Sequence, residues 1–402
     1  MADGARDAWI TGIGIVSTLG EGPQAHWQKL MSGQPEADTA TFAPFIVHPL
    51  APVSFDAQIP KKGDQRQMED WQRIGTYAAG LALDSAGLKG KTEILSHMDM
   101  IVAAGGGERD LGVDSTILSG MPNAANPAAF LNERLMSDLR PTLFLAQLSN
   151  LLAGNISIVH GVTGSSRTFM GEEASGVDAV RVALARITAG QSDIALVGGS
   201  HNAERPDLLM LYEFGQFNLK ERYAPVWERG DAGGFALGSL GAFLVIEARE
   251  HAQARGAKPL AQLTAVVSDR SKRAPGAVNA ALARLWDKVK GGVNSGQAAV
   301  LSGATGAQPA TSEERAFLEG LREEGFSDLA VRATGSYLGH GLEPQFAMNV
   351  ALAAVALGHG SLFPPCDSSG LERPSSGDVS QILVTGVGHW RGEGLALVQR
   401  AD

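Results

Sequence analysis

Residues 164–200 read GSSRTFMGEEASGVDAVRVALARITAGQSDIALVGGS, and this stretch indicates how the surrounding chain folds. Val177, Val180, Leu184 and Ile187 recur at spacings of three and four, which predicts a helix with one apolar face that ends near Gly190. The run IALVGGS at 194–200 is short, apolar and closed by glycines, as in a strand covered on both faces. The stretch therefore predicts a helix–strand unit of an α/β sheet.

The entrance to this helix, Gly171-Glu172-Glu173, is the first candidate functional site. Helix N-termini at the end of a strand favour anions and often carry the chemistry of α/β folds. A carboxylate there also has a plain structural explanation, because the helix dipole favours negative charge in the first turn by about 0.3–1 kcal/mol. The motifs that flank Glu173 favour the functional interpretation.

The same alternation of strands and helices continues on both sides of this unit. Buried strands are predicted at 8–16, 98–104 and 156–159, and helices at 70–86 and 128–154, with a loop between 111 and 127. A second series of strands, loops and helices starts near Gly233, so we expect two halves, residues 1–232 and 233–402. A chain of 402 residues is also longer than one typical core requires.

Composition narrows the class of protein. A net charge of −10 without a long basic cluster argues against a nucleic-acid-binding surface. The longest apolar run, at 350–357, is too short to cross a membrane, and the first residues lack the pattern of a signal peptide. With one cysteine, Cys366, the chain forms no internal disulfide, so we expect a cytoplasmic protein.

Several motifs in the right order give the chain a likeness to a known family. These are ITGIGIVSTLG, GVTGSSRT, AGQSDIALVGGS, RGDAGGFALGSLGAFLVIEAREHAQARGAK, GSYLGH and SLFPP. Together they resemble the β-ketoacyl-acyl-carrier-protein synthases, the ketosynthases of thiolase fold. The resemblance implies a duplicated five-layer αβαβα fold, a dimer, an acyl carrier protein as partner, and condensation of an acyl chain with a malonyl thioester.

The resemblance places Glu173 where the family has its nucleophilic cysteine. The family's first catalytic histidine corresponds to Gly303, whereas Thr305 and Glu314 keep their family positions. The second histidine is kept as His340, and the lysine of that motif is replaced by Gly335.

A second alignment, with GHG set further along the family motif, would lose His340 as well, but it leaves more unmatched residues. The family's glycine-rich gate corresponds to VTGVGHWRGEG, in which His389 or Trp390 is expected at the gate. We interpret Cys366 as structural.

The missing thiol leaves three functional hypotheses. A carboxylate nucleophile would form an acyl anhydride, which is too reactive to hold a chain, so we expect no ordinary condensation. The first hypothesis is a chain-length-factor-like partner of a Cys-bearing homologue, and a homodimer stays open. The second is a malonyl-carrier-protein decarboxylase in which a protonated Glu173 and His340 polarise the thioester, and the third is an unorthodox synthase. No cofactor and no metal are predicted, because no ligands cluster in the sequence.

Overall fold

The structure is a computed structural model that describes residues 6–375 and 377–401. Its main sheet consists of two sets of five strands. An additional short strand, β2 (Gly20–Glu21), pairs with β1 (Ala8–Ser17). The first set has the order β5–β4–β6–β8–β1, and the second has the order β11–β10–β12–β13–β9. The strands of the first set are β1 (Ala8–Ser17), β4 (Asp99–Ala103), β5 (Ser166–Phe169), β6 (Ile194–His201) and β8 (Leu240–Ala248). Those of the second set are β9 (Ala261–Asp269), β10 (Ala298–Ser302), β11 (Ala330–Ala333), β12 (Gln381–Val387) and β13 (Glu393–Gln399).

The two sets have the same topology. In each set, the third strand in sequence pairs with the second, followed by the fourth, fifth and first, and the first two of these pairings are parallel while the others are antiparallel. The sets meet where β1 pairs with β9 through Trp9 and Gln262 and through Ile10 and Ala261. The duplication expected from the sequence is therefore present in the strand order.

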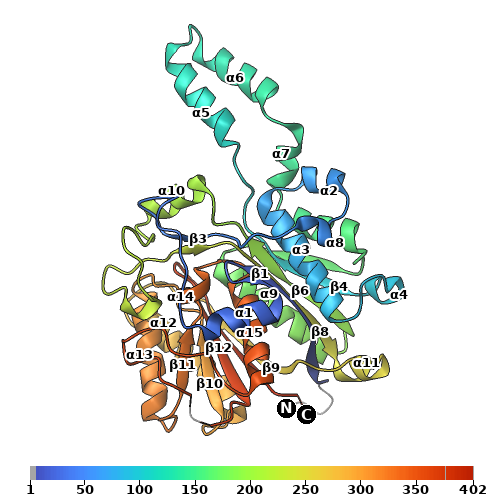
Figure 1. Cartoon of the computed structure of the whole chain (residues 1–402), viewed down its shortest axis with the longest axis vertical. Helices are drawn as coiled ribbons and strands as arrows, with labels where there is room; N and C mark the ends of the chain where they lie inside the picture. The colour runs from blue at the N-terminus through green and yellow to red at the C-terminus, as the bar shows by residue number, and fades with distance from the viewer. Residues whose placement is uncertain (1–5, 376, 402) are drawn as a thin grey trace.

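Helices complete five layers around these strands (Figure 1). The helices α3 (Asp70–Ser85) and α8 (Leu151–His160) pack on one outer face, and α12 (Ala277–Val289) and α13 (Ala310–Glu323) pack on the other. Between the two sets lie α9 (Glu173–Thr188) and α15 (Gln345–His359), which contact each other and strands of both sets. This is the αβαβα arrangement of the thiolase-like fold, and the fold prediction is confirmed.

Shorter elements connect these layers. The two-stranded sheet consists of β3 (Val47–His48) and β7 (Leu237–Gly238). The remaining helices of the body are α1 (Gly22–Met31), α2 (Lys62–Gln67), α4 (Thr92–Leu95), α10 (Pro206–Phe214), α11 (Arg249–Ala254) and α14 (Gly335–Leu338), with 3₁₀ turns η1 (Phe55–Ala57), η2 (Met121–Asn123), η3 (Val226–Glu228) and η4 (Lys290–Gly292). Among the described residues, none of the helices has the length and apolar character that a membrane crossing requires.

A helical arm projects from the body above α3 and α10 (Figure 1). The arm consists of α5 (Leu111–Gly120) and α6 (Pro127–Asp138), and α7 (Pro141–Ala146) leads back to the body. The loop predicted for 111–127 is therefore wrong. The Asp110 side chain accepts a hydrogen bond from the Val113 N–H and starts α5, and Asn126 caps α6 through the Ala129 N–H.

The strand predicted at 156–159 is also wrong, because these residues belong to α8. The helix packs against α3 through the buried Ile156 and ends at Gly161, whose φ of 76° is the left-handed conformation that glycine adopts readily. A run such as ISIV fits a strand or a buried helix turn equally well by hydrophobicity alone. Packing against α3 stabilises residues 156–159 as a helix.

The division of the chain at residues 232 and 233 stays a prediction. The strand β8 follows residue 233, yet it pairs with β1 and β6 of the first set. Strand order therefore favours a boundary between the halves that lies after β8 and before β9.

Candidate active site

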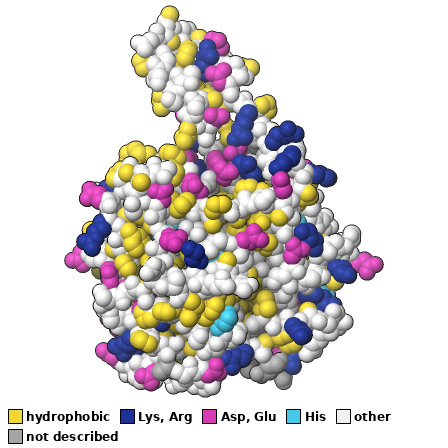
Figure 2. Space-filling view, viewed as in Figure 1, with side chains coloured by type: hydrophobic (Ala, Val, Ile, Leu, Met, Phe, Trp, Pro, Cys, Tyr) yellow, Lys and Arg dark blue, Asp and Glu magenta, His cyan; other side chains and the backbone are white. Residues whose placement is uncertain are grey.

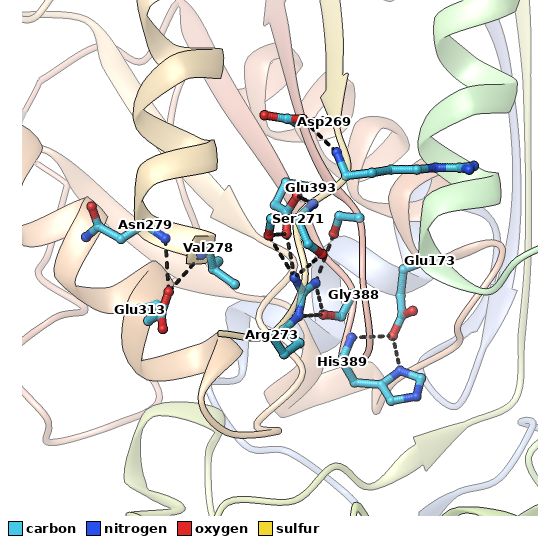
Figure 3. Close-up of polar contacts among 12 residues, drawn as sticks. Glu173, Asp269, Ser271, Arg273, Val278, Asn279, Glu313, Gly388, His389 and Glu393 are labelled. Atoms are coloured by element: carbon cyan, nitrogen blue, oxygen red, sulfur yellow. Dashed lines mark hydrogen bonds and ion pairs between the residues drawn. The ribbon is translucent and has the colours of Figure 1, made fainter. Parts of the chain in front are cut away.

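The candidate site is centred on Glu173, the first residue of α9, whose side chain is buried. Its Oε1 atom faces His340 Nε2 at 2.7 Å and His389 Nδ1 at 2.8 Å, and it accepts a hydrogen bond of 3.2 Å from the His389 backbone N–H. Figure 3 shows the two contacts with His389. The second oxygen, Oε2, has no hydrogen-bond partner among the described residues.

The charge state of Glu173 follows from these contacts. Burial alone would raise the pKa of the carboxyl, but the positive charge of His389 and the hydrogen bonds from His340 and His389 outweigh it and hold the pKa well below its usual range. Burial lowers the pKa of His389, whereas the Glu173 carboxylate raises it, with a net upward shift. The centre of the site is thus an ionised carboxylate held by two imidazole rings.

The backbone before Glu173 has an unusual conformation. Glu172 has a φ of 56° and a ψ of −138°, which a non-glycine residue rarely adopts. The Ser175 N–H and hydroxyl both donate to the Glu172 carbonyl oxygen, at 3.1 and 2.6 Å. This sharp turn directs Glu173 into the interior from the helix entrance.

His340 comes from the second half of the chain, and its ring lies beside Glu173. It follows α14, and Gly339 before it has a φ of 70°, which allows the chain to turn inward. The His340 N–H donates to the Ala236 carbonyl oxygen at 2.7 Å, and the His340 carbonyl oxygen accepts from the Gly238 N–H at 3.0 Å. These backbone bonds fix the position of the imidazole ring next to Glu173.

His389 is the residue of the gate segment that enters the site. The His389 side chain is buried among the rings of Tyr212, Phe217 and Phe235, whereas the neighbouring Trp390 is 62% exposed. Arg273 anchors the segment by donating to the Gly388 carbonyl oxygen and pairing with Glu393 (Figure 3). Of the two residues that the sequence offered for the gate, His389 points into the site and Trp390 points to solvent.

The other residues predicted from the family motifs lie near β10 and have no direct contact with Glu173. The Gly303 N–H donates to Thr385 Oγ1 at 2.9 Å, and a Cβ built at Gly303 would lie 2.5 Å from the Thr385 carbonyl oxygen. A histidine at 303 would therefore require the backbone of β12 to move. Thr305 Oγ1 accepts from the Ala307 N–H within a turn.

Gly335 and Glu314 lie next to the same end of β10 as Gly303 and Thr305. A Cβ at Gly335 would lie 3.1 Å from the Ala304 carbonyl oxygen, so the position has little room for a longer side chain. Glu314 is buried and accepts hydrogen bonds from Ser302 and Thr385, and burial raises its pKa to about 7. The catalytic roles that the resemblance implies for these positions stay predictions.

Two further ionisable residues near Glu173 were not found from the sequence. His201 ends β6, and its Nδ1 lies 3.9 Å from Glu343 Oε2, with both side chains buried. Burial and the neighbouring carboxylates raise the pKa of Glu343 to about 8, and burial with the charge of Arg205 lowers that of His201 to about 3. The sequence contained one signal for His201, which is its position at the end of a predicted buried strand. No feature of the sequence pointed to Glu343.

The thiol of Cys366 takes no part in this group. Cys366 packs against the central hydrophobic cluster, to which both halves contribute, and burial raises its pKa to about 12. A thiol in that state carries almost no thiolate at neutral pH, so it is a poor nucleophile. Its interpretation as structural remains in agreement with these surroundings.

Comparisons with known proteins give the same family as the motifs. The family model described as "Beta-ketoacyl synthase, N-terminal domain" matches residues 5–252. A 3-oxoacyl-[acyl-carrier-protein] synthase 2 of Vibrio cholerae serotype O1 is 24% identical over 395 residues, which cover 92% of this chain and 90% of that protein.

Solved structures extend the likeness over nearly the whole chain. The structure titled "The ishigamide ketosynthase/chain length factor" aligns with a TM-score of 0.79 and 20% identity, covering 99% of this chain and 100% of the other. A type II polyketide acyl-carrier protein in complex with its ketosynthase, AntDE:AntF, aligns with a TM-score of 0.76 and 16% identity, with the same coverage. These structural matches support the fold.

Proposed function

Because this chain belongs to the β-ketoacyl synthase family, we propose that it acts in acyl-chain or polyketide synthesis as a non-condensing partner of a Cys-bearing ketosynthase. In this role the chain pairs with the active subunit and shapes the space into which the acyl chain grows. The observation that carries the proposal is the state of Glu173, a buried carboxylate at the position of the family's nucleophile.

The chemistry of Glu173 opposes condensation by this chain. Acyl transfer to a carboxylate would give an anhydride, whereas the reaction needs a thioester that forms and breaks with comparable ease. Loss of a catalytic nucleophile lowers turnover by about a millionfold in a well-studied protease. His340 and His389 both contact Glu173 Oε1, so neither is free to stabilise an enolate oxygen in this arrangement.

Exposed apolar side chains support the partner role. Leu118 and Met136 of the arm are 70% and 80% exposed, and Phe144 of α7 is 72% exposed. Hydrophobic side chains are visible on the arm and over α10 in Figure 2. The strand β5 is at the edge of the sheet, where a strand of a second subunit can pair with it. Exposed apolar side chains and open strand edges are both typical of subunit interfaces.

A basic cavity beside the gate supports an acyl carrier protein as a further partner. The cavity has a volume of about 510 Å³ and is lined by Arg270, Ser271, Lys272, Arg273, Trp390 and Arg391. Its cations suit the phosphate of a carrier arm or an acidic protein surface. In the known complex AntDE:AntF, a carrier protein binds a ketosynthase of the same fold.

The test compares this chain alone with the chain co-expressed with a Cys-bearing ketosynthase from the same source. We expect no condensation of acyl and malonyl carrier thioesters by the isolated chain. With the partner, we expect a mixed dimer that condenses. Robust condensation by the isolated chain that disappears in Glu173→Ala would contradict the proposal, and so would failure of the two chains to associate.

Decarboxylation of a malonyl carrier thioester is the second candidate, in which His340 or His389 would leave Glu173 Oε1 and polarise the thioester. The form of it that needs a protonated Glu173 is not supported, because the surrounding histidines keep this carboxyl ionised. Release of carbon dioxide from malonyl carrier protein by the isolated chain would establish it, with His340→Ala as the control. An unorthodox synthase remains the third alternative and would be detected in the condensation assay.

A further inference from the structure

Glu173, His340 and His389 form a group whose members come from three separate segments of the chain. One ligand atom of each, a carboxylate oxygen or an imidazole nitrogen, lies within 4.8 Å of the others, and all three side chains are buried. Two histidines and one carboxylate are a ligand set that zinc uses in catalytic sites. The sequence predicted Glu173 and His340 as site residues and His389 as one of two gate residues, but not that the three meet, because the histidines are 167 and 216 residues from Glu173.

The surroundings of the group favour a cation. Glu173 is only 5% exposed, and its Oε2 atom has no hydrogen-bond partner in the described part of the chain. The Glu172 carboxylate also lies beside the group, with its Oε1 atom 3.8 Å from His389 Nε2. The nearby Arg205 is paired with Asp207, and Arg273 with Glu393. A buried carboxylate with one oxygen that has no hydrogen-bond partner gains from contact with a cation.

We propose that Glu173, His340 and His389 bind one zinc ion at the former nucleophile position, with a fourth ligand position left open. Each imidazole would bind through the nitrogen that now faces Glu173 Oε1, and its proton would move to the other ring nitrogen or to solvent. His389 Nε2 lies 3.8 Å from Glu172 Oε1, so this carboxylate can hold the ring N–H. Nitrogen ligands select zinc over magnesium and calcium, which bind oxygen.

This inference does not depend on the partner role, because it concerns the isolated chain. The test uses the full chain without a polyhistidine tag, stripped with a chelator and then equilibrated with Zn²⁺ alone. We expect one zinc per chain by elemental analysis, measured after gel filtration. Co²⁺ in place of zinc should give the visible absorption of a four-coordinate nitrogen and oxygen site.

Variants make the test specific. Glu173→Gln keeps the size of the side chain but removes its charge, and His389→Ala removes one nitrogen ligand. Both should lower the bound zinc from one per chain to less than 0.1, which corresponds to a loss of affinity of about a hundredfold or more. His97→Ala is the matched control, because His97 is exposed and lies outside the group. Circular dichroism establishes that each variant is folded.

Two results would overturn the proposal. One is wild-type protein that binds no more zinc than the Glu173→Gln variant. The other is zinc bound equally by His389→Ala, which would place the ion elsewhere. If His389→Ala does not fold, the comparison of Glu173→Gln with the wild type still decides.

Discussion

Single residues distinguish this candidate site from the site that the family resemblance implies for a condensing enzyme. The family resemblance assigns one histidine to position 303, which is glycine here, and the structure supplies a second imidazole from His389 in the gate segment. The replacement changes what the imidazoles do, because both now contact a carboxylate. Glu173 is thus a buried carboxylate held by two imidazoles, at the position that the family resemblance assigns to a reactive thiol.

Glu314 gives a prediction about pH at the scale of a residue. Burial raises its pKa from 4.5 to about 7. Between these values the folded state keeps a proton that the unfolded state has lost, so the free energy of unfolding falls as pH rises. Relative to Glu314→Gln, the wild type should lose about 2–3 kcal/mol of stability between about pH 5 and pH 8. Urea unfolding of both proteins at the two pH values measures it.

The comparison with Glu314→Gln cancels the titration of all other groups. The glutamine can still accept the hydrogen bonds from Ser302 and Thr385 that reach Oε1. Parallel pH dependence of the wild type and the variant would show that Glu314 does not titrate in this range.

At the scale of elements, α9 and the segment before α15 determine the geometry of the site together. Gly176, in the first turn of α9, lies directly against the backbone of Glu343, and a Cβ built there would be 2.2 Å from the Glu343 carbonyl oxygen. This close contact holds the helix entrance next to the loop that carries His340. The spacing between Glu173 and His340 therefore depends on a glycine that has no polar contact with either.

We predict that Gly176→Ala destabilises the protein by about 1–3 kcal/mol, because the methyl group forces the two segments apart. The matched control is Gly320→Ala in α13, where a Cβ would meet no atom within 4 Å. That substitution should stabilise the helix by up to about 1 kcal/mol. Urea unfolding at a single pH compares the two variants. Equal effects at both positions would contradict the packing argument.

For the whole molecule, the arm and α7 present the surface available to a partner. These elements extend from the body and, like α10 of the body, expose large apolar side chains (Figures 1 and 2). The arm is long relative to its contacts with the body, which is more typical of a segment that packs on another subunit than of a free surface.

On the partner proposal, the double variant Met136→Glu with Phe144→Glu should weaken association with the Cys-bearing ketosynthase at least about tenfold, or about 1.4 kcal/mol. Charges at exposed positions should leave the thermal unfolding of the isolated chain nearly unchanged. Leu260→Glu is the control, since Leu260 is 41% exposed near the start of β9. Sedimentation of the co-purified complex measures the affinity, and equal binding by both variants would exclude the arm and α7 as the interface.

The sequence by itself determined the elements with a strong local pattern. The apolar spacing in 177–187 and the glycine-closed run at 194–200 predict α9 and β6, and the ordered motifs predict the family and the duplicated fold. The same motifs identify Glu173 and His340. Patterns of this kind can be recognised in the sequence because each depends on residues that are close together in the chain.

Only the tertiary structure decided which side chains meet at Glu173. His389 enters from the gate because Arg273 holds the segment and an aromatic cluster encloses the ring, while His201 and Glu343 approach from a strand end and a loop. The helical form of 156–159 likewise depends on packing against α3. These contacts join residues that are distant in sequence, so their physical cause is the packing of the layers and not a local pattern.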